Sequence, residues 1–147
     1  MTANSNASAK DGDGNTYVLD VAFEQPVEAV WAAITQKQLI DQYYFSAVNA
    51  DITQVGAEIF YGAAEHKLIT GRVVALEAPR LLKHTFRFAE EADTSETIVT
   101  YALAGDGTGP RLHLEHHGYA ANSQGYADIA GGWPIIVGGL KGVLEKK

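Results

Sequence analysis

A glycine-rich segment, Gly131–Pro134, opens a long apolar run near the end of the chain. The spacing of the apolar residues after it predicts a long helix with one apolar face. Because most of the chain before it has strand patterns, this helix must cover a sheet. We expect a single β-rich domain with an internal hollow that fits a small, mostly apolar molecule. The apolar positions are Ile135, Ile136, Val137, Leu140, Val143 and Leu144.

Glycines interrupt this expected helix. Each costs about 0.5–1 kcal/mol relative to alanine in a helix interior. Pro134 also removes a helical hydrogen bond unless it lies in the first turn. The helix should therefore be kinked, begin near Trp133, or depend on tertiary contacts, and one hypothesis is that it forms a mobile wall of the hollow. The glycines are Gly131, Gly132, Gly138, Gly139 and Gly142.

The composition indicates one acidic globular domain. The chain has 147 residues, of which 46% are hydrophobic and 20% charged, values that are ordinary for a soluble protein. A net charge of −7 argues against binding to nucleic acid or to an anionic membrane, which both require basic residues. The sequence has no cysteine, no secretory signal and no apolar stretch of the roughly 18 residues that a membrane span needs. We expect a cytoplasmic protein.

Local patterns predict the elements of the N-terminal half. Alternating apolar residues predict a strand at about 17–23. One apolar face at helical spacing predicts a helix at about 27–34. Thr35 and Gln38 have the spacing of a capping box, which predicts a second short helix that continues to about Tyr44.

Strands dominate the rest of the chain until the last helix. The glycine-rich turn at 105–109 is a strong hairpin signal. Asn122 and Ser123 are candidate N-caps for the last helix. The expected strands lie at about 47–52, 57–61, 66–77, 82–88, 96–104 and 110–117.

This order of elements predicts an α+β fold rather than alternating βαβ units. A curved antiparallel sheet of about six to seven strands should wrap around the long C-terminal helix, with two short helices after the first strand. We expect residues 1–16 to form a disordered tail, because they have almost no large apolar side chains. Residues 17–147 should form a single domain.

A set of short motifs runs through the chain in order: Val30–Thr35, Gln42–Phe45, Val55–Gly56, Gly71–Leu82, His84–Phe86, Gly132–Pro134 and Leu144–Glu145. Over about residues 17–145 the set resembles the helix-grip fold of the START-like (SRPBCC) superfamily, the birch-pollen-allergen and polyketide-cyclase group. Within it, the chain is similar to the branch named after the activator of the heat-shock-protein-90 ATPase. The resemblance implies the fold. It carries over no catalytic residue, because that branch has no universal catalytic motif.

Two histidines are expected on the inner face of the sheet. His84 has the same parity as Leu82, and His116 the same parity as Leu114. A histidine in the hollow would orient a ligand carbonyl or transfer a proton, because its pKa lies near neutrality. The alternative is a structural histidine bonded to its neighbours, and this interpretation is favoured for both.

Aromatic side chains supply most other candidates for the binding site. Residues 43–45 end the second expected helix, where this fold opens toward solvent, so we place them at the mouth of the hollow. Ordinary core packing explains several of these residues equally well. The expected ligand-binding residues are His84, His116, Tyr43, Tyr44, Phe45, Phe60, Phe86, Phe88, Tyr101, Trp133 and Val137.

No metal ion or cofactor is expected. His113, Glu115 and His117 alternate along one strand, but successive side chains on one face of a strand are about 7 Å apart. Their apolar neighbours should take the inner face and leave these three toward water. Residues 11–15 resemble the start of a calcium loop, yet the required glycine and glutamate do not follow.

Three functions remain open from the sequence. The first is intracellular binding of a small apolar or amphipathic molecule between the sheet and the last helix. The second is an enzyme of the cyclase or dehydratase type, in which a cavity histidine acts as acid or base. The third, which only the family name suggests and which is the least favoured, is a module that stimulates a chaperone ATPase. The glycine-rich helix surface would also suit a homodimer.

Overall fold

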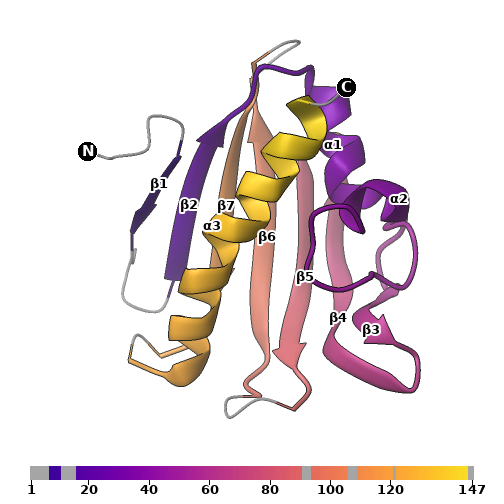
Figure 1. Ribbon diagram of the computed structural model, residues 1–147, viewed down its shortest axis with the longest axis vertical. Coiled ribbons are helices and arrows are strands. Elements are labelled where there is room, and N and C mark those ends of the chain that lie inside the picture. Colours follow the sequence, from indigo (N-terminus) through magenta and orange to yellow (C-terminus); the bar gives the residue numbers. More distant parts are fainter. Residues whose placement is uncertain (1–6, 11–15, 91–93, 106–108, 121, 146–147) are drawn as a thin grey trace.

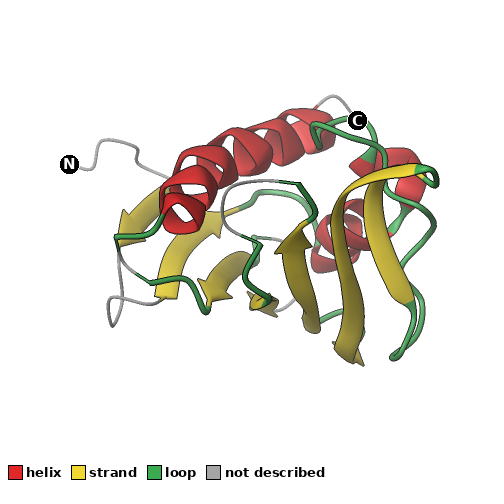
Figure 2. Cartoon of the chain, turned by 90° about the horizontal axis from the view of Figure 1, so that it is seen from below, coloured by secondary structure: helices red, strands yellow, loops and turns green. Residues whose placement is uncertain are grey.

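In the computed structural model, a long helix crosses one face of a curved antiparallel sheet (Figures 1 and 2). Two short helices lie beside its C-terminal end and cover the neighbouring part of the same face. This architecture is the α+β arrangement predicted from the sequence, and that prediction is confirmed. The structure describes residues 7–10, 16–90, 94–105, 109–120 and 122–145.

The strands that the structure describes form one sheet in the order β1-β2-β7-β6-β5-β4-β3, with every neighbouring pair antiparallel. They are β1 (Ala7–Lys10), β2 (Thr16–Ala22), β3 (Glu58–Ala63), β4 (His66–Glu77), β5 (Leu81–Phe88), β6 (Thr97–Ala104) and β7 (Arg111–His117). The helices are α1 (Val27–Thr35), α2 (Lys37–Ile40) and α3 (Gln124–Glu145).

Strand alternation decides which side chains face α3. His84 in β5 pairs with Val99 in β6, which in turn pairs with His116 in β7. All three side chains are buried, so they form one row across the concave face. The predicted inward orientation of both histidines is confirmed.

The pairing of β4 with β5 is irregular. The pairing register shifts between Val73 and Ala75. Nearby, a Cβ atom added to Gly71 would lie 1.9 Å from the carbonyl oxygen of Thr85. A side chain at position 71 would therefore push the two strands apart, and glycine permits their close approach.

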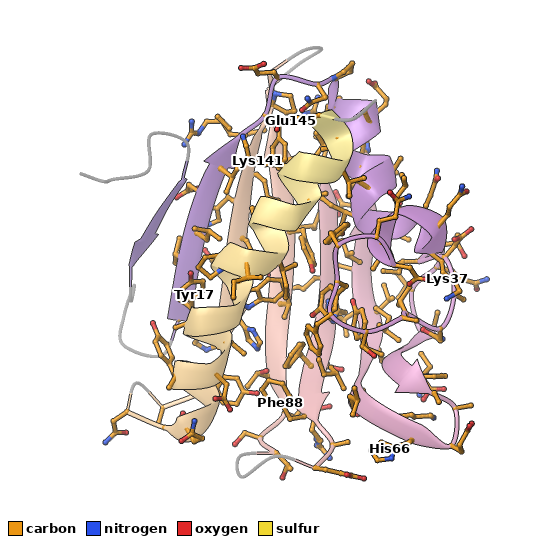
Figure 3. All side chains as sticks on the ribbon, in the orientation of Figure 1. Tyr17, Lys37, His66, Phe88, Lys141 and Glu145 are labelled. Carbon is orange, nitrogen blue, oxygen red and sulfur yellow. The ribbon has the colours of Figure 1, made fainter. Side chains whose placement is uncertain are left out.

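Helix α3 begins well before Trp133, which was one of the starting points considered from the sequence. Ser123 is its N-cap, because its Oγ accepts the backbone N–H of Tyr126 at 3.1 Å. The helix then continues through Pro134, so a start near Trp133 is wrong. Its buried face supports it, and Lys141 Nζ donates to a backbone carbonyl of β2 at 2.6 Å (Figure 3). The buried apolar residues of this face are Tyr126, Ile129, Trp133, Ile136, Val137, Leu140, Val143 and Leu144.

The segment between α1 and β3 differs from its prediction. Thr35 ends α1, and its hydroxyl donates to the carbonyl of Trp31 at 2.9 Å, so it caps no second helix. Helix α2 is correspondingly short. The strand expected at 47–52 is also wrong, since only Val48 forms an isolated bridge, with Tyr61.

The N-terminal segment is partly ordered. Residues 7–10, which were expected to be disordered, form β1 and pair with β2 from Ala7↔Val21 to Lys10↔Val18. The prediction is therefore wrong for these residues. The calcium-like segment 11–15 and residues 1–6 lie outside the described part of the chain. Within the described part, no helix is both long and apolar enough to cross a membrane.

Candidate functional site

A pocket of about 270 Å³ lies between the N-terminal half of α3, the end of β5 and the segment after α2. Figure 3 shows Phe88, one of its lining residues, at the end of β5. The lining is mainly aromatic and apolar, with one charged side chain. The lining residues are Tyr44, Phe45, Phe86, Phe88, Asp128, Ile129, Gly132, Trp133 and Ile136.

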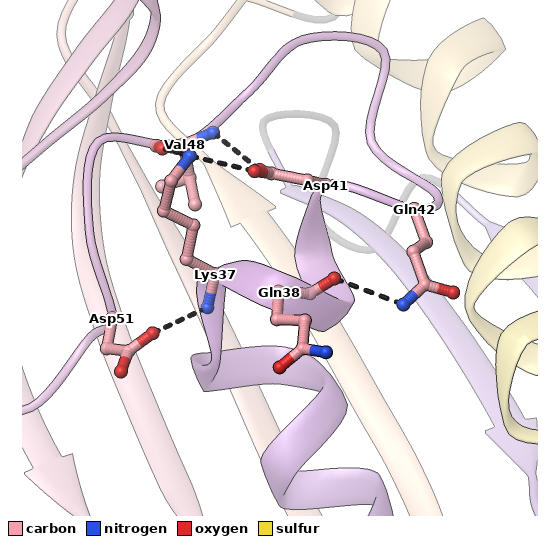
Figure 4. A network of polar contacts seen from close by, with 6 residues as sticks. All are labelled: Lys37, Gln38, Asp41, Gln42, Val48 and Asp51. Atoms are coloured by element: carbon pink, nitrogen blue, oxygen red, sulfur yellow. Dashed lines mark hydrogen bonds and ion pairs between the residues drawn. The ribbon is translucent and has the colours of Figure 1, made fainter.

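A polar network holds the segment that forms one lip of the pocket (Figure 4). Lys37 Nζ donates to Asp41 Oδ2 at 2.7 Å and to the carbonyl of Val48 at 2.8 Å. Asp41 Oδ1 accepts the backbone N–H of Val48 at 3.0 Å, and Asp51 Oδ1 accepts that of Lys37 at 2.8 Å. Side chains thus satisfy backbone groups that a strand at 47–52 would have paired with a neighbour.

This network positions two aromatic rings at the mouth of the pocket. The ring of Tyr44 stacks on that of Tyr61, with centroids 4.2 Å apart and planes within 12°. Burial raises the pKa of Tyr44 well above its ordinary value, so its hydroxyl stays neutral. Phe45 is 63% exposed beside Tyr44. Tyr44 and Phe45 therefore both line the pocket, and the exposed ring of Phe45 lies beside its opening.

A buried hydrogen-bond chain lies behind one pocket wall. Trp133 Nε1–H donates to His116 Nδ1 at 2.9 Å, so this nitrogen carries no proton. The neutral ring must then be protonated at Nε2, which donates to Thr97 Oγ1 at 2.7 Å. The Thr97 hydroxyl donates a hydrogen bond to the carbonyl of Phe86 at 2.9 Å. Each of the side-chain polar atoms in this series of hydrogen bonds thus has a partner within the protein.

His116 is therefore a structural residue. Burial lowers its pKa from 6.5 to about 3, and the nearby His84 adds to the effect. Both ring nitrogens are occupied, and the ring does not line the pocket. The interpretation favoured from the sequence, a hydrogen-bonded core histidine, fits this geometry.

His84 is equally buried but has different partners. Its Nδ1–H donates to the carbonyl of Thr85 at 2.7 Å, and its ring stacks near Tyr101, with centroids 6.1 Å apart. Burial lowers its pKa from 6.5 to about 4. His84 is thus a neutral imidazole near neutral pH, and it lies in the core rather than in the pocket wall.

Four other expected binding residues also lie outside the pocket lining. The Tyr43 hydroxyl donates a hydrogen bond to the carbonyl of Ala33 at 2.7 Å and so links the segment after α2 to α1. Tyr101 and Val137 are buried in the core. Phe60 points away from the concave face, because alternation in β3 turns its neighbours inward, and Lys67 Nζ lies 4.5 Å from its ring centroid.

Four lining residues come from α3 and were not among the candidates: Asp128, Ile129, Gly132 and Ile136. Together with Trp133 they follow helical spacing, so they share one face. The signal that identifies them is the Ser123 N-cap, which extends the helix far enough toward the N-terminus to include them.

The histidines outside the core contact carboxylates or a threonine hydroxyl. His113 donates from Nδ1 to Asp20 at 2.7 Å and from Nε2 to Glu115 at 2.8 Å. These contacts raise the pKa of His113, and the hydrogen bond to Glu115 is the largest cause. His117 Nδ1 lies 2.6 Å from Thr16 Oγ1. Over the described residues, no group of histidines and carboxylates is arranged to hold a metal ion.

Comparison with known proteins gives one family match. The family model for activator of Hsp90 ATPase homolog 1-like proteins matches residues 24–145. No curated protein matches the chain at a significant level.

Solved structures share the fold across almost the whole chain. Protein MLL2253 from Mesorhizobium loti superposes with a TM-score of 0.79 at 25% identity, over 90% of this chain and 98% of that one. CalU16 from Micromonospora echinospora gives 0.73 at 19% identity, over 94% and 83%. DynU16, from the dynemicin biosynthetic locus, gives 0.75 at 23% identity, over 89% of this chain and 47% of DynU16. This chain therefore spans about half the length of DynU16.

Proposed function

Because the chain belongs to the family of activator of Hsp90 ATPase homolog 1-like proteins and has the helix-grip fold, we propose that it binds a small, largely apolar molecule between α3 and β5. The observation that carries the proposal is the pocket of about 270 Å³ at this place. Its walls include five aromatic rings and two isoleucines. Apolar walls with few polar groups are typical of sites for small molecules.

The volume of the pocket limits the size of its ligand. An apolar cavity of about 150 Å³ holds benzene, so a pocket of this size would hold roughly eleven non-hydrogen atoms. A fused pair of aromatic rings with one short substituent has this size. Larger molecules would extend past Phe45 into solvent, since that ring is exposed at the mouth.

Binding is better supported than proton-transfer chemistry. A general acid or base must reach the reacting atom and have a pKa near the working pH. Neither His84 nor His116 lines the pocket, and burial lowers the pKa of both. A role in stimulating a chaperone ATPase has only the family name in its favour.

Two adjacent glycines of α3 offer a matched test. An added Cβ has open space at both Gly131 and Gly132, but only Gly132 lines the pocket. Gly132→Leu should fill the pocket, whereas Gly131→Leu should place the same side chain in solvent. We expect Gly132→Leu to weaken binding of the neutral probe 2-naphthylmethanol at least tenfold, measured by NMR titration, and Gly131→Leu to bind like the wild type.

Equal binding by all three proteins would contradict the pocket assignment, and so would absence of binding to the wild type. Native mass spectrometry of the purified protein would then give the mass of any ligand that it carries from the cell.

A further inference from the structure

The pocket has an unbalanced charge. Asp128 is the one charged residue in its lining, and none of the lining residues is lysine, arginine or histidine. An anionic ligand would therefore enter an apolar site that contains a carboxylate and no cation. Such a ligand would be repelled and would also lose its hydration.

A hydrogen bond holds Asp128 in place, but no cation among the described residues pairs with it. It is partly buried on α3, and its Oδ1 accepts one N–H of Gln124 Nε2 at 2.8 Å, one helical turn earlier. In the part of the chain that the structure describes, Oδ2 has no hydrogen-bond partner and no cation forms an ion pair with Asp128. One carboxylate oxygen thus remains available to a ligand.

The aromatic walls favour the same kind of ligand. The negative faces of Trp, Tyr and Phe rings attract ammonium groups, with a larger effect where water is excluded. Tyr44, Phe45, Phe86, Phe88 and Trp133 line the pocket together with Asp128. The net charge of −7 adds a long-range attraction for cations.

We infer that the ligand of this pocket is a cationic amphiphile: an apolar, ring-sized body that bears a protonated amine, with the amine beside Asp128. The inference rests on the proposed function and adds the chemical class of the ligand. It assigns Asp128 as the residue that determines this selectivity.

Three probes with the same body test the inference at pH 7 and low salt: 2-naphthylmethylamine, 2-naphthylmethanol and 2-naphthoate. We expect the wild type to bind the amine about tenfold more tightly than the alcohol, and the carboxylate most weakly, as a partly desolvated charge pair with cation–π contacts implies. Added salt should reduce the preference for the amine.

The variants separate the two proposals. Asp128→Asn should bind the alcohol as the wild type does and lose the preference for the amine. Glu28→Gln removes the same charge from α1, outside this pocket, and should retain the preference. Equal affinity for amine and alcohol in the wild type, or a preference that survives Asp128→Asn, would overturn the inference while leaving the pocket assignment intact. Failure of all three probes to bind would overturn the proposed function itself.

Discussion

At the scale of single residues, one hydroxyl joins the two sides of the core. Thr97 Oγ1 accepts from His116 and donates to the carbonyl of Phe86, and His116 in turn accepts from Trp133. The chain thus connects β5, β6, β7 and α3. Because these atoms are buried, any missing member leaves a polar group without a partner or water.

Thr97→Val keeps the shape of the side chain and removes the hydroxyl. We expect it to lower the free energy of unfolding by about 1–3 kcal/mol, because His116 Nε2–H would be buried without an acceptor. Urea denaturation followed by circular dichroism measures the effect. Thr100→Val, three residues along β6 and on the outer face between Lys83 and Glu115, is the control and should change stability by less than about 0.5 kcal/mol. Similar losses in both variants would mean that the hydroxyl chain contributes little.

The sequence predicted which face of the sheet a side chain takes better than it predicted the hydrogen-bond partners of that side chain. Alternation is local, so it placed His84 and His116 on the inner face. The partner of His116 is Trp133, which lies on α3 and is brought close only by the complete fold. Phe60 was expected in the binding site but lies outside the pocket lining; β3 is a short strand in which apolar residues occupy both faces.

At the scale of elements, the glycines of α3 have unequal roles. An added Cβ would meet nothing within 4 Å at Gly138, whereas at Gly139 it would lie 2.9 Å from Tyr43 Cβ and 3.4 Å from the Tyr43 carbonyl oxygen. Gly139 therefore lets α3 approach the segment after α2. Gly138 only lowers the helix propensity.

Alanine at these neighbouring positions should have opposite effects. We expect Gly138→Ala to raise the free energy of unfolding by about 0.5–1 kcal/mol through helix propensity. Gly139→Ala should lower it by about 1–3 kcal/mol, because the helix must move away from Tyr43. Thermal unfolding of both variants beside the wild type gives the comparison. A stabilising Gly139→Ala would show that the contact with Tyr43 relaxes freely.

The long elements were predictable and the segment between α1 and β3 was not. Strands β4 to β7 and helix α3 repeat their pattern over many residues, so periodicity identifies them. Residues 41–52 are shaped by side-chain contacts such as those of Lys37 and Asp41. Those contacts depend on the tertiary structure, and the local pattern resembled a strand instead.

At the scale of the whole molecule, the two buried histidines make stability depend on pH. Their folded-state pKa values of about 4 and about 3 lie below the ordinary 6.5. Between those values and 6.5, the unfolded chain binds protons that the folded chain does not. Their effect on stability is therefore negligible above pH 6.5 and becomes unfavourable as the pH falls toward 4.

Lowering the pH from 7 to 5 should reduce the free energy of unfolding by about 3–4 kcal/mol from these two groups. His113 opposes this loss, since its pKa is raised, but its exposure keeps its contribution small. His84→Gln removes one titrating group. The slope of the free energy of unfolding between pH 6 and 5 should then fall to about half of the slope in the wild type, measured by urea denaturation at each pH. An unchanged slope would mean that His84 is not held neutral by burial.

The architecture of the whole molecule followed from the order of its elements and the family resemblance, whereas the position of the pocket did not. The expected binding residues included His84, Tyr101 and Val137, but these side chains are buried in the core. The proposed binding pocket lies instead where α3 meets the end of β5 and the segment that holds Tyr44. That place depends on how three distant segments meet.

The order of the elements also has a consequence for biosynthesis. The strands that the structure describes all precede α3 in the chain, so the ribosome releases the sheet before it releases the helix that shields the concave surface. Until then, side chains such as Leu82, Val99 and Leu114 lack the cover that α3 provides, although they are fully buried in the finished molecule. Cooperative folding of the domain must therefore wait until translation has passed Glu145.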